Sequence, residues 1–189
     1  LDILEMLLNQ DNEREEVVFR MGYAHQGLEN YSQAITYYQQ TISMNPAQEH
    51  AVYELNYCLD IIGELSKGRA FYEHFVNDDP YAHFAWYDLG IFYSKTQEYS
   101  KALEAFDYAT TIKDDFAQAY VEMGHLYMDM KNYVDAQKSY TQALEDIEDN
   151  PDLFCCIGAC YEKQGDYEAA VINYKAALKV EQDWEDAWY

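Results

Sequence analysis

The chain has 189 residues, of which 35 are acidic and 12 are basic, and its formal net charge is −23. This charge argues against nucleic acid as a partner, because affinity for phosphates comes from Lys and Arg, and against a membrane surface, which attracts basic segments. No apolar run approaches the roughly 20 residues that a transmembrane helix needs. The four cysteines are not spaced as a disulfide framework, so we expect reduced thiols and favour a cytoplasmic location.

A step of 34 residues relates several sets of similar residues, as from Gly90 to Gly124 and from Gly124 to Gly158. The sets are a glycine set (Gly22, Gly90, Gly124 and Gly158, with Asn56 at the remaining place), a small-residue set (Ala34, Gly68, Ala102, Ala136 and Ala170) and an aromatic set (Tyr38, Tyr72, Phe106, Tyr140 and Tyr174). A fixed period of this length is typical of repeat proteins, in which each unit packs on its neighbours.

Each unit contains two stretches whose apolar residues recur at helical spacing. In the fourth unit, Tyr120 and Tyr127 belong to a first stripe, and Ala136 and Tyr140 belong to a second. This is the pattern of an amphipathic helix, and turn residues such as those at 164–166 separate the two helices of a unit. Neither helix can bury its apolar side alone, so the units must stack.

The third unit carries the motif of a known family. Residues 86–93 follow the pattern W-x2-L-G-x2-Y, and residues 102–106 follow A-x3-F. The chain therefore resembles tetratricopeptide repeat proteins, whose repeats have this motif and this length. The resemblance covers the whole chain and implies an all-α fold, a right-handed α-solenoid of helix-turn-helix repeats.

In this register the chain is one solenoid domain of five complete repeats and two partial ones. Residues 1–14 fit the second helix of a partial repeat, and residues 185–189 begin a sixth. The complete repeats are 15–48, 49–82, 83–116, 117–150 and 151–184. Terminal repeats of solenoids usually carry polar caps, and none is evident here. We therefore expect the chain to be a fragment of a longer repeat array, with end-to-end stacking of copies as the alternative.

The repeating small residues suggest where the two helices of a repeat approach each other. We expect the glycine set, which includes Gly22, to face the small-residue set, which includes Ala34, because small side chains allow a close crossing of two backbones. The second repeat departs from this pattern, since Asn56 is larger than glycine and Gly68 is smaller than alanine.

Motifs for catalysis or for cofactor binding are absent from the sequence. It contains neither a glycine-rich phosphate loop nor an HExxH motif. Cys156 and Cys160 have a spacing that suits metal ligands, but two further ligands are not evident nearby. No combination of nucleophile, base and orienting partner is recognisable. We expect no enzymatic activity, no metal and no cofactor.

The resemblance also implies where a partner binds, because the first helix of each repeat lines a concave groove in this family. Carried over to this chain, the candidate peptide-binding residues come from the first four repeats. They are Phe19, Tyr23, Tyr53, Glu54, Tyr57, Phe84, Tyr87, Asp88, Glu122 and His125. Aromatic side chains are good binding anchors, because they supply contact area at a low entropic cost.

Charge in the candidate groove indicates the chemistry of the partner. Chaperone-binding members of the family hold a terminal carboxylate with basic groove residues, whereas Arg20 is followed in its column by Glu54, Asp88 and Glu122. Acidic carboxylate-clamp ligands would meet like charge here. We therefore predict a protein interaction scaffold for a neutral or basic peptide or helix with apolar anchors. The alternatives are a glycan or other small-ligand module that uses the groove tyrosines, and head-to-tail self-assembly.

Overall fold

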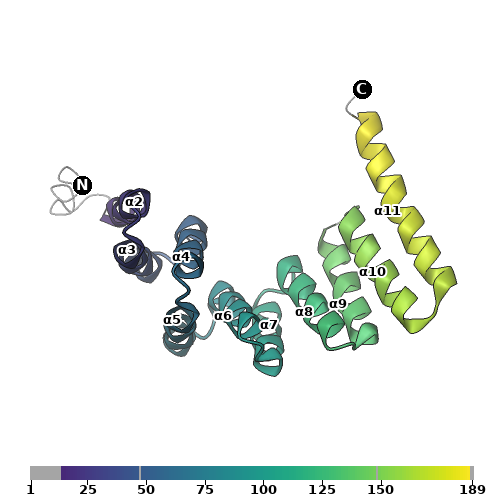
Figure 1. Cartoon of the computed structure of the whole chain (residues 1–189), viewed down its shortest axis with the longest axis horizontal. Helices are drawn as coiled ribbons and strands as arrows, with labels where there is room; N and C mark the ends of the chain where they lie inside the picture. The colour runs from purple at the N-terminus through teal and green to yellow at the C-terminus, as the bar shows by residue number, and fades with distance from the viewer. Residues whose placement is uncertain (1–13, 47, 148, 188–189) are drawn as a thin grey trace. The chain divides into compact units, whose positions relative to one another are not determined.

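The computed structural model describes residues 14–46, 48–147 and 149–187. Within these ranges every regular element is an α-helix, and successive helices are joined by short turns (Figure 1). The helices are α2 (Arg14–Gly27), α3 (Tyr31–Met44), α4 (Glu49–Ile61), α5 (Leu65–Asp78), α6 (His83–Lys95), α7 (Tyr99–Ile112), α8 (Ala117–Asp129), α9 (Tyr133–Asp146), α10 (Pro151–Gln164) and α11 (Tyr167–Ala187). The predicted all-α architecture of helix-turn-helix repeats is confirmed.

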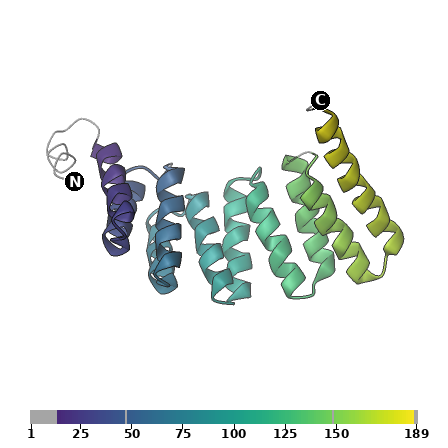
Figure 2. The same ribbon diagram turned by 45° about the horizontal axis from the view of Figure 1, so that its top comes forward.

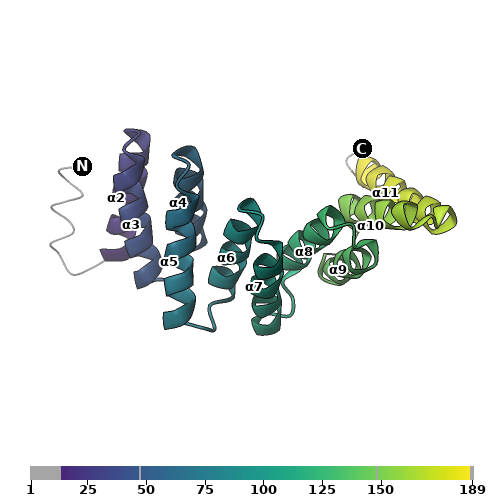
Figure 3. The ribbon, with the colours of Figure 1, turned by 60° about the horizontal axis from the view of Figure 1, so that its bottom comes forward.

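The chain divides into two compact units, Leu1–His74 and Phe75–Tyr189, which we call unit 1 and unit 2. The division falls inside α5. In unit 1, α3 packs against both α2 and α4. In unit 2, the pairs α6–α7, α8–α9 and α10–α11 lie side by side as antiparallel hairpins, and contacts of α7 with α8 and of α9 with α10 join the hairpins (Figures 2 and 3).

The turn inside each repeat has the same backbone conformation. The residue at its centre has a positive φ, between 55° and 85°, in all five repeats: Glu29, Gly63, Gln97, Lys131 and Gly165. The next residue donates its N–H to a carbonyl five residues earlier, as from Asn30 to His25 at 2.9 Å. This is the Schellman arrangement, which satisfies the last carbonyl groups of the first helix and reverses the chain.

The glycine set lies against aromatic rings, which corrects the prediction made from the sequence. A β-carbon at Gly22 would lie 2.7 Å from Cε1 of Tyr38, and one at Gly90 would lie 2.6 Å from Cε1 of Phe106. The nearest group to each glycine is thus the ring that follows it by sixteen residues, and not the expected alanine such as Ala34. The reason is volume, because the ring fills the crossing point and leaves no space for a side chain on the first helix.

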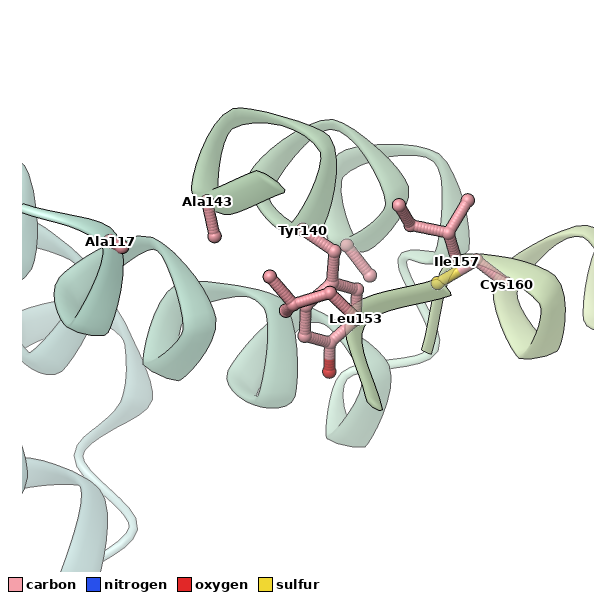
Figure 4. Close-up of a cluster of buried hydrophobic side chains, with 7 residues drawn as sticks. Ala117, Tyr140, Ala143, Leu153, Ile157 and Cys160 are labelled. Atoms are coloured by element: carbon pink, nitrogen blue, oxygen red, sulfur yellow. The ribbon is translucent and has the colours of Figure 1, made fainter. Parts of the chain in front are cut away.

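The rings of the aromatic set also form the centre of the core. In unit 2, Tyr140 is 1% exposed and packs with Leu153, Ile157 and Cys160 of α10 (Figure 4). The ring therefore contributes both to its own repeat and to the next one. Burial of these side chains is the main source of stability, since each fully buried apolar side chain contributes about 1.5–3 kcal/mol.

At the ends of the chain, two predicted partial repeats meet the limits of the described residues. Residues 1–13, assigned above to a partial repeat, lie outside them. At the other end, α11 continues without interruption to Ala187 and so passes through the boundary at 184–185, where we expected a sixth repeat to begin. No described helix is both long enough and apolar enough to cross a membrane.

Candidate functional site

Three tyrosines of unit 1 present their side chains to solvent. Tyr23 on α2 is 61% exposed, and Tyr53 and Tyr57 on α4 are 69% and 43% exposed. We call these three residues the tyrosine patch. All three are among the predicted binding residues. Large exposed aromatic groups on neighbouring helices are characteristic of interaction surfaces.

A chain of hydrogen bonds connects α2, α3 and α4 next to this patch. The Tyr38 hydroxyl donates to Oε1 of Gln26 at 2.5 Å, and Nε2 of Gln26 donates to Oε2 of Glu54 at 2.7 Å. The Cys58 thiol also donates to Oε1 of Gln26, at 3.5 Å. We call Tyr38, Gln26 and Glu54 the Gln26 bridge. It fixes the carboxylate of Glu54 relative to α2 and α4, the first helices of the two repeats that begin in unit 1.

The bridge arises from the packing of the aromatic set. Because Gly22 has no side chain, the Tyr38 ring lies directly against α2 at this position, and its hydroxyl reaches Gln26, one turn further along α2. Phe19 packs on the same ring, with 5.7 Å between the ring centroids, and is half-buried. Phe19 therefore packs on the ring that belongs to the bridge and offers only part of its own ring to a partner.

The tyrosine patch and the bridge share the helices α2 and α4. Tyr23 lies three residues before Gln26, and Tyr57 lies three residues after Glu54. Residues three or four apart are neighbours on a helix surface, and this relation also holds between Tyr53 and Tyr57. The hydrogen bond between Gln26 and Glu54 therefore links two helix surfaces that each carry an exposed tyrosine within one turn of the bridge.

The electrostatics of the bridge set its proton positions. Burial raises the pKa of Tyr38 well above its ordinary value, with smaller contributions from Glu54, Cys58 and Tyr23. Burial, and then Glu54, raise the pKa of Cys58 to about 11. Both groups keep their protons at neutral pH and act as donors. Gln26 consequently turns its carbonyl oxygen to them and its amide group to the carboxylate.

In unit 2 the two predicted aromatic site residues are packed. The ring of Tyr87 lies against Phe106 and Phe116, with centroid distances of 5.7 and 5.1 Å. Burial raises the pKa of Tyr87, and Glu122 and Asp88 add to the shift. Phe84 is half-buried and lies edge-on to Phe75 at 5.4 Å. These two rings stabilise the fold and present little surface to a partner.

The polar site residues of unit 2 differ in exposure. Asp88 is only 5% exposed, which does not fit the expected acidic groove residue. Asp is one methylene shorter than the Glu residues of its column, so its carboxylate stays close to the helix. Glu122 is half-buried, whereas His125 is exposed, and its Nδ1 lies 2.8 Å from the hydroxyl of Tyr140.

The site candidates chosen from the sequence include Glu54 but omit the groups that hold it. Gln26 and Tyr38 were not among them, although both take part in the bridge. One available signal was the choice of Tyr over Phe at four places of the aromatic set. A buried hydroxyl needs a partner, and this need predicts a polar residue on the facing helix. Its identity does not follow from the repeat pattern.

Histidine, cysteine and acidic side chains are the groups that hold metal ions in proteins. Within the part of the chain that the structure describes, no three such residues are placed to hold a metal ion. The four cysteines are free, and Cys160 donates to Sδ of Met128 at 3.4 Å.

The repeats match models of a known family. Residues 15–48 and 85–116 match one model described as tetratricopeptide repeat, and residues 121–187 match another with the same description. Together these matches cover more than half of the chain. The chain belongs to the tetratricopeptide repeat family. No curated protein matches its sequence.

Solved structures of other tetratricopeptide repeat proteins share the fold. A crystal structure of MamA has a TM-score of 0.74 and 22% identity, covering 92% of this chain and 95% of that one. MamA 41-end from Desulfovibrio magneticus RS-1 has a TM-score of 0.70 and 14% identity, covering 89% and 96%. YrrB, described as a TPR protein with an unusual peptide-binding site, has a TM-score of 0.65 and 14% identity, covering 95% and 93%.

Tetratricopeptide repeats are protein interaction modules, because their stacked first helices offer extended surfaces to other chains. The present chain has the architecture of such a scaffold. Among the residues whose exposure the structure describes, the most exposed aromatic side chains on first helices are those of the tyrosine patch in unit 1.

Proposed function

We propose that this protein is a non-enzymatic interaction scaffold that binds a neutral or basic peptide or helical segment on the tyrosine patch. The observation that carries the proposal is the exposure of Tyr23, Tyr53 and Tyr57 around a carboxylate held in place by hydrogen bonds. Tyrosine rings bury a large area when a partner covers them and lose little side-chain entropy. Binding there therefore requires little reorganisation of the protein.

The charge of the patch favours partners that are not acidic. Glu54 belongs to it, and the nearby Arg20 pairs with Glu16, Nε to Oε1 at 2.6 Å. The basic group that a carboxylate clamp would use is thus already engaged. The net charge of −23 further disfavours an acidic segment. A segment that places an apolar side chain against the rings and carries neutral or basic side chains elsewhere suits both the aromatic patch and its negative charge.

Peptide recognition is also a described property of one protein with this fold, YrrB. In our proposal the surface of unit 1 has the main role. Glu122 and His125 of unit 2 are half-buried and exposed, respectively, and we assign them to secondary contacts with longer partners. Phe84, Tyr87 and Asp88 are packed within unit 2, and we assign them to support of its fold.

The test is selection of random twelve-residue peptides displayed on phage, using the whole chain as bait. Selected peptides are synthesised, and their affinities are measured by fluorescence anisotropy at low and moderate salt. We expect Tyr23→Ala and Tyr57→Ala each to weaken binding about tenfold or more, as at an interface hot spot. The matched control is Tyr167→Ala in unit 2, since Tyr167 is 67% exposed but lies outside the patch.

Equal binding by the two patch variants and the wild type would overturn the proposal. Because these tyrosines are exposed, thermal unfolding of each variant should match the wild type, which separates loss of binding from loss of structure. An oligosaccharide array is run alongside. Binding of a glycan that depends on Tyr57, with no selected peptide, would assign the patch to sugar recognition instead.

A further inference from the structure

We propose that the tyrosine patch recognises an arginine side chain of the partner, whose guanidinium group pairs with Glu54. This inference rests on the proposed function and names the residue that the patch selects. Three observations support it: the state of the Glu54 carboxylate, the rings on the same helices, and the lack of an ion pair between Glu54 and any described cation of unit 1.

The carboxylate of Glu54 has unused acceptor capacity. Oε2 accepts the hydrogen bond from Gln26, whereas no hydrogen bond to Oε1 is made by any residue that the structure describes. The side chain is half-buried. An ionised carboxylate has about four acceptor positions, so both oxygens can receive further donors from a ligand. The Gln26 bridge holds the group still and so lowers the entropic cost of pairing.

Among the described residues of unit 1, which begin at Arg14, no cation pairs with this carboxylate. The described ion pairs of the unit join Arg20 to Glu16, Lys67 to Glu64 and Arg69 to Glu73. Glu54 is held by a neutral amide alone, and the neutral thiol and phenol behind that amide add no positive charge. A cation that reaches this half-buried carboxylate would form a charge-assisted hydrogen bond with it, which is stronger than a hydrogen bond between neutral groups.

The rings beside Glu54 distinguish arginine from lysine. Tyr57 follows Glu54 by one helical turn, and Tyr23 lies one turn from Gln26 on the facing helix. A guanidinium group is planar, so it can donate two parallel hydrogen bonds to a carboxylate and at the same time stack on a tyrosine face. An ammonium group makes a point contact and is more strongly hydrated. The combination of a fixed carboxylate and exposed ring faces therefore selects arginine.

Unit 2 provides a matched comparison. Glu122 occupies the same column as Glu54 and is likewise half-buried. The position that corresponds to Tyr57 is occupied by His125, whose Nδ1 is engaged with Tyr140. Glu122 therefore lacks the phenol ring that follows Glu54 by one turn. The control for Glu54→Gln is Glu145→Gln, because Oε2 of Glu145 also accepts a hydrogen bond from a glutamine amide, Nε2 of Gln142 at 2.7 Å, and Glu145 is not a predicted binding residue.

The experiment is an NMR titration of the whole chain with three probes: N-acetyl-arginine methylamide and the corresponding lysine and citrulline compounds. Citrulline has the shape of arginine without its charge. We expect saturable shifts of the Tyr23, Gln26 and Tyr57 amide signals with the arginine probe. Binding of citrulline should be about tenfold weaker, since it lacks both the ion pair and the cation–π contact.

Two variants test whether the arginine probe binds at Glu54. Glu54→Gln keeps an oxygen for the amide of Gln26 and should retain the fold, yet it should lower arginine affinity to the level of citrulline. Glu145→Gln should leave arginine affinity unchanged. Equal binding of arginine and citrulline, equal binding of arginine and lysine, or full binding by Glu54→Gln would each overturn the inference.

Failure of this inference is distinguishable from failure of the proposed function. Displayed peptides that need Tyr57, contain no arginine and bind Glu54→Gln normally would retain the interaction surface and overturn the arginine assignment. Selected peptides with an enriched arginine, whose affinity falls about tenfold in Glu54→Gln, would support both.

Discussion

Corresponding residues of the two units have different environments, although the repeat pattern treats them alike. Tyr53 in unit 1 and Tyr87 in unit 2 occupy the same column, yet Tyr53 is 69% exposed and Tyr87 is packed between Phe106 and Phe116. The repeat pattern itself contains one difference, because the position that corresponds to Phe116 in the repeat of Tyr53 is occupied by Ala82, which has no ring. The position in the repeat therefore fixes where a side chain leaves its helix. The neighbouring side chains decide whether it is exposed and able to bind a partner.

The largest expected effect concerns the close crossing inside a repeat. In unit 2, Gly90→Ala would place a β-carbon 2.6 Å from the Phe106 ring. We expect the free energy of unfolding to fall by about 3 kcal/mol, because a packed core cannot accept the added carbon without moving the ring. Urea denaturation measures this change.

The control for that substitution lies in unit 1. Gly27 is also helical, but a β-carbon there would have no heavy atom within 4 Å. Gly27→Ala should be neutral or slightly stabilising. The two variants separate crowding from helix propensity, and a similar loss in both would contradict the crossing that we describe. Unit 1 itself shows the tolerated alternative, since Asn56 replaces the glycine and accepts a hydrogen bond from Tyr72 at 3.2 Å.

The second prediction tests the comparison between Tyr53 and Tyr87 directly. Tyr87→Ala should lower the free energy of unfolding by about 2 kcal/mol, because it removes a ring that is partly buried against two others. Tyr53→Ala should change it by less than about 0.5 kcal/mol, as expected for a surface position. Thermal or urea unfolding gives both values. Equal losses would mean that Tyr53 is packed as firmly as its counterpart.

The repeats were predictable because their signal is redundant. Many columns recur at one spacing, so the substitution at Asn56 did not obscure the hairpins. The crossing partner of Gly22 was predicted wrongly, since helical spacing identifies a face but not which side chain fills it. The Gln26 bridge was missed for a similar reason: it depends on where the Tyr38 hydroxyl emerges, and this is set by the ring packing beneath Gly22.

The third prediction concerns the buried thiols, one in each unit. The pKa values of Cys58 and Cys160 are raised from 9.0 to about 11, first by burial and then by Glu54 and Cys156, respectively. A thiol with a raised pKa binds its proton more tightly in the folded state. Stability is therefore complete below pH 9 and falls as the pH rises from 9 towards 11.

For Cys58, this coupling of proton binding to folding should lower the free energy of unfolding by about 1 kcal/mol between pH 8 and pH 10. The free energy of unfolding should fall by that much more in the wild type than in Cys58→Ala over this range. Glu54→Gln should reduce the difference, because it removes the second cause of the shift. The same substitution should leave the contribution of Cys160 unchanged, since burial and then Cys156, and not Glu54, raise the pKa of Cys160. A wild type and a Cys58→Ala variant with parallel pH profiles would refute the assignment.

The smallest effect is expected where the two units do not differ, in the turn inside each repeat. Glu29 in unit 1 and Gln97 in unit 2 have φ values of 59° and 62°, a conformation that costs a residue with a β-carbon about 1–2 kcal/mol. Glycine avoids this cost but loses about 0.5–1 kcal/mol through the entropy of the unfolded chain. Glu29→Gly and Gln97→Gly should therefore each stabilise the protein by about 0.5 kcal/mol.

The reverse substitution, Gly165→Gln, should destabilise the protein by a similar amount, because Gly165 has a φ of 83°. Urea denaturation of the three variants is the measurement. The Schellman hydrogen bonds are the same in both units, so Glu29→Gly and Gln97→Gly should act equally. A gain confined to one unit would show that side-chain contacts, and not the backbone alone, stabilise the turn, and the contrast between the units would then extend from their surfaces to their turns.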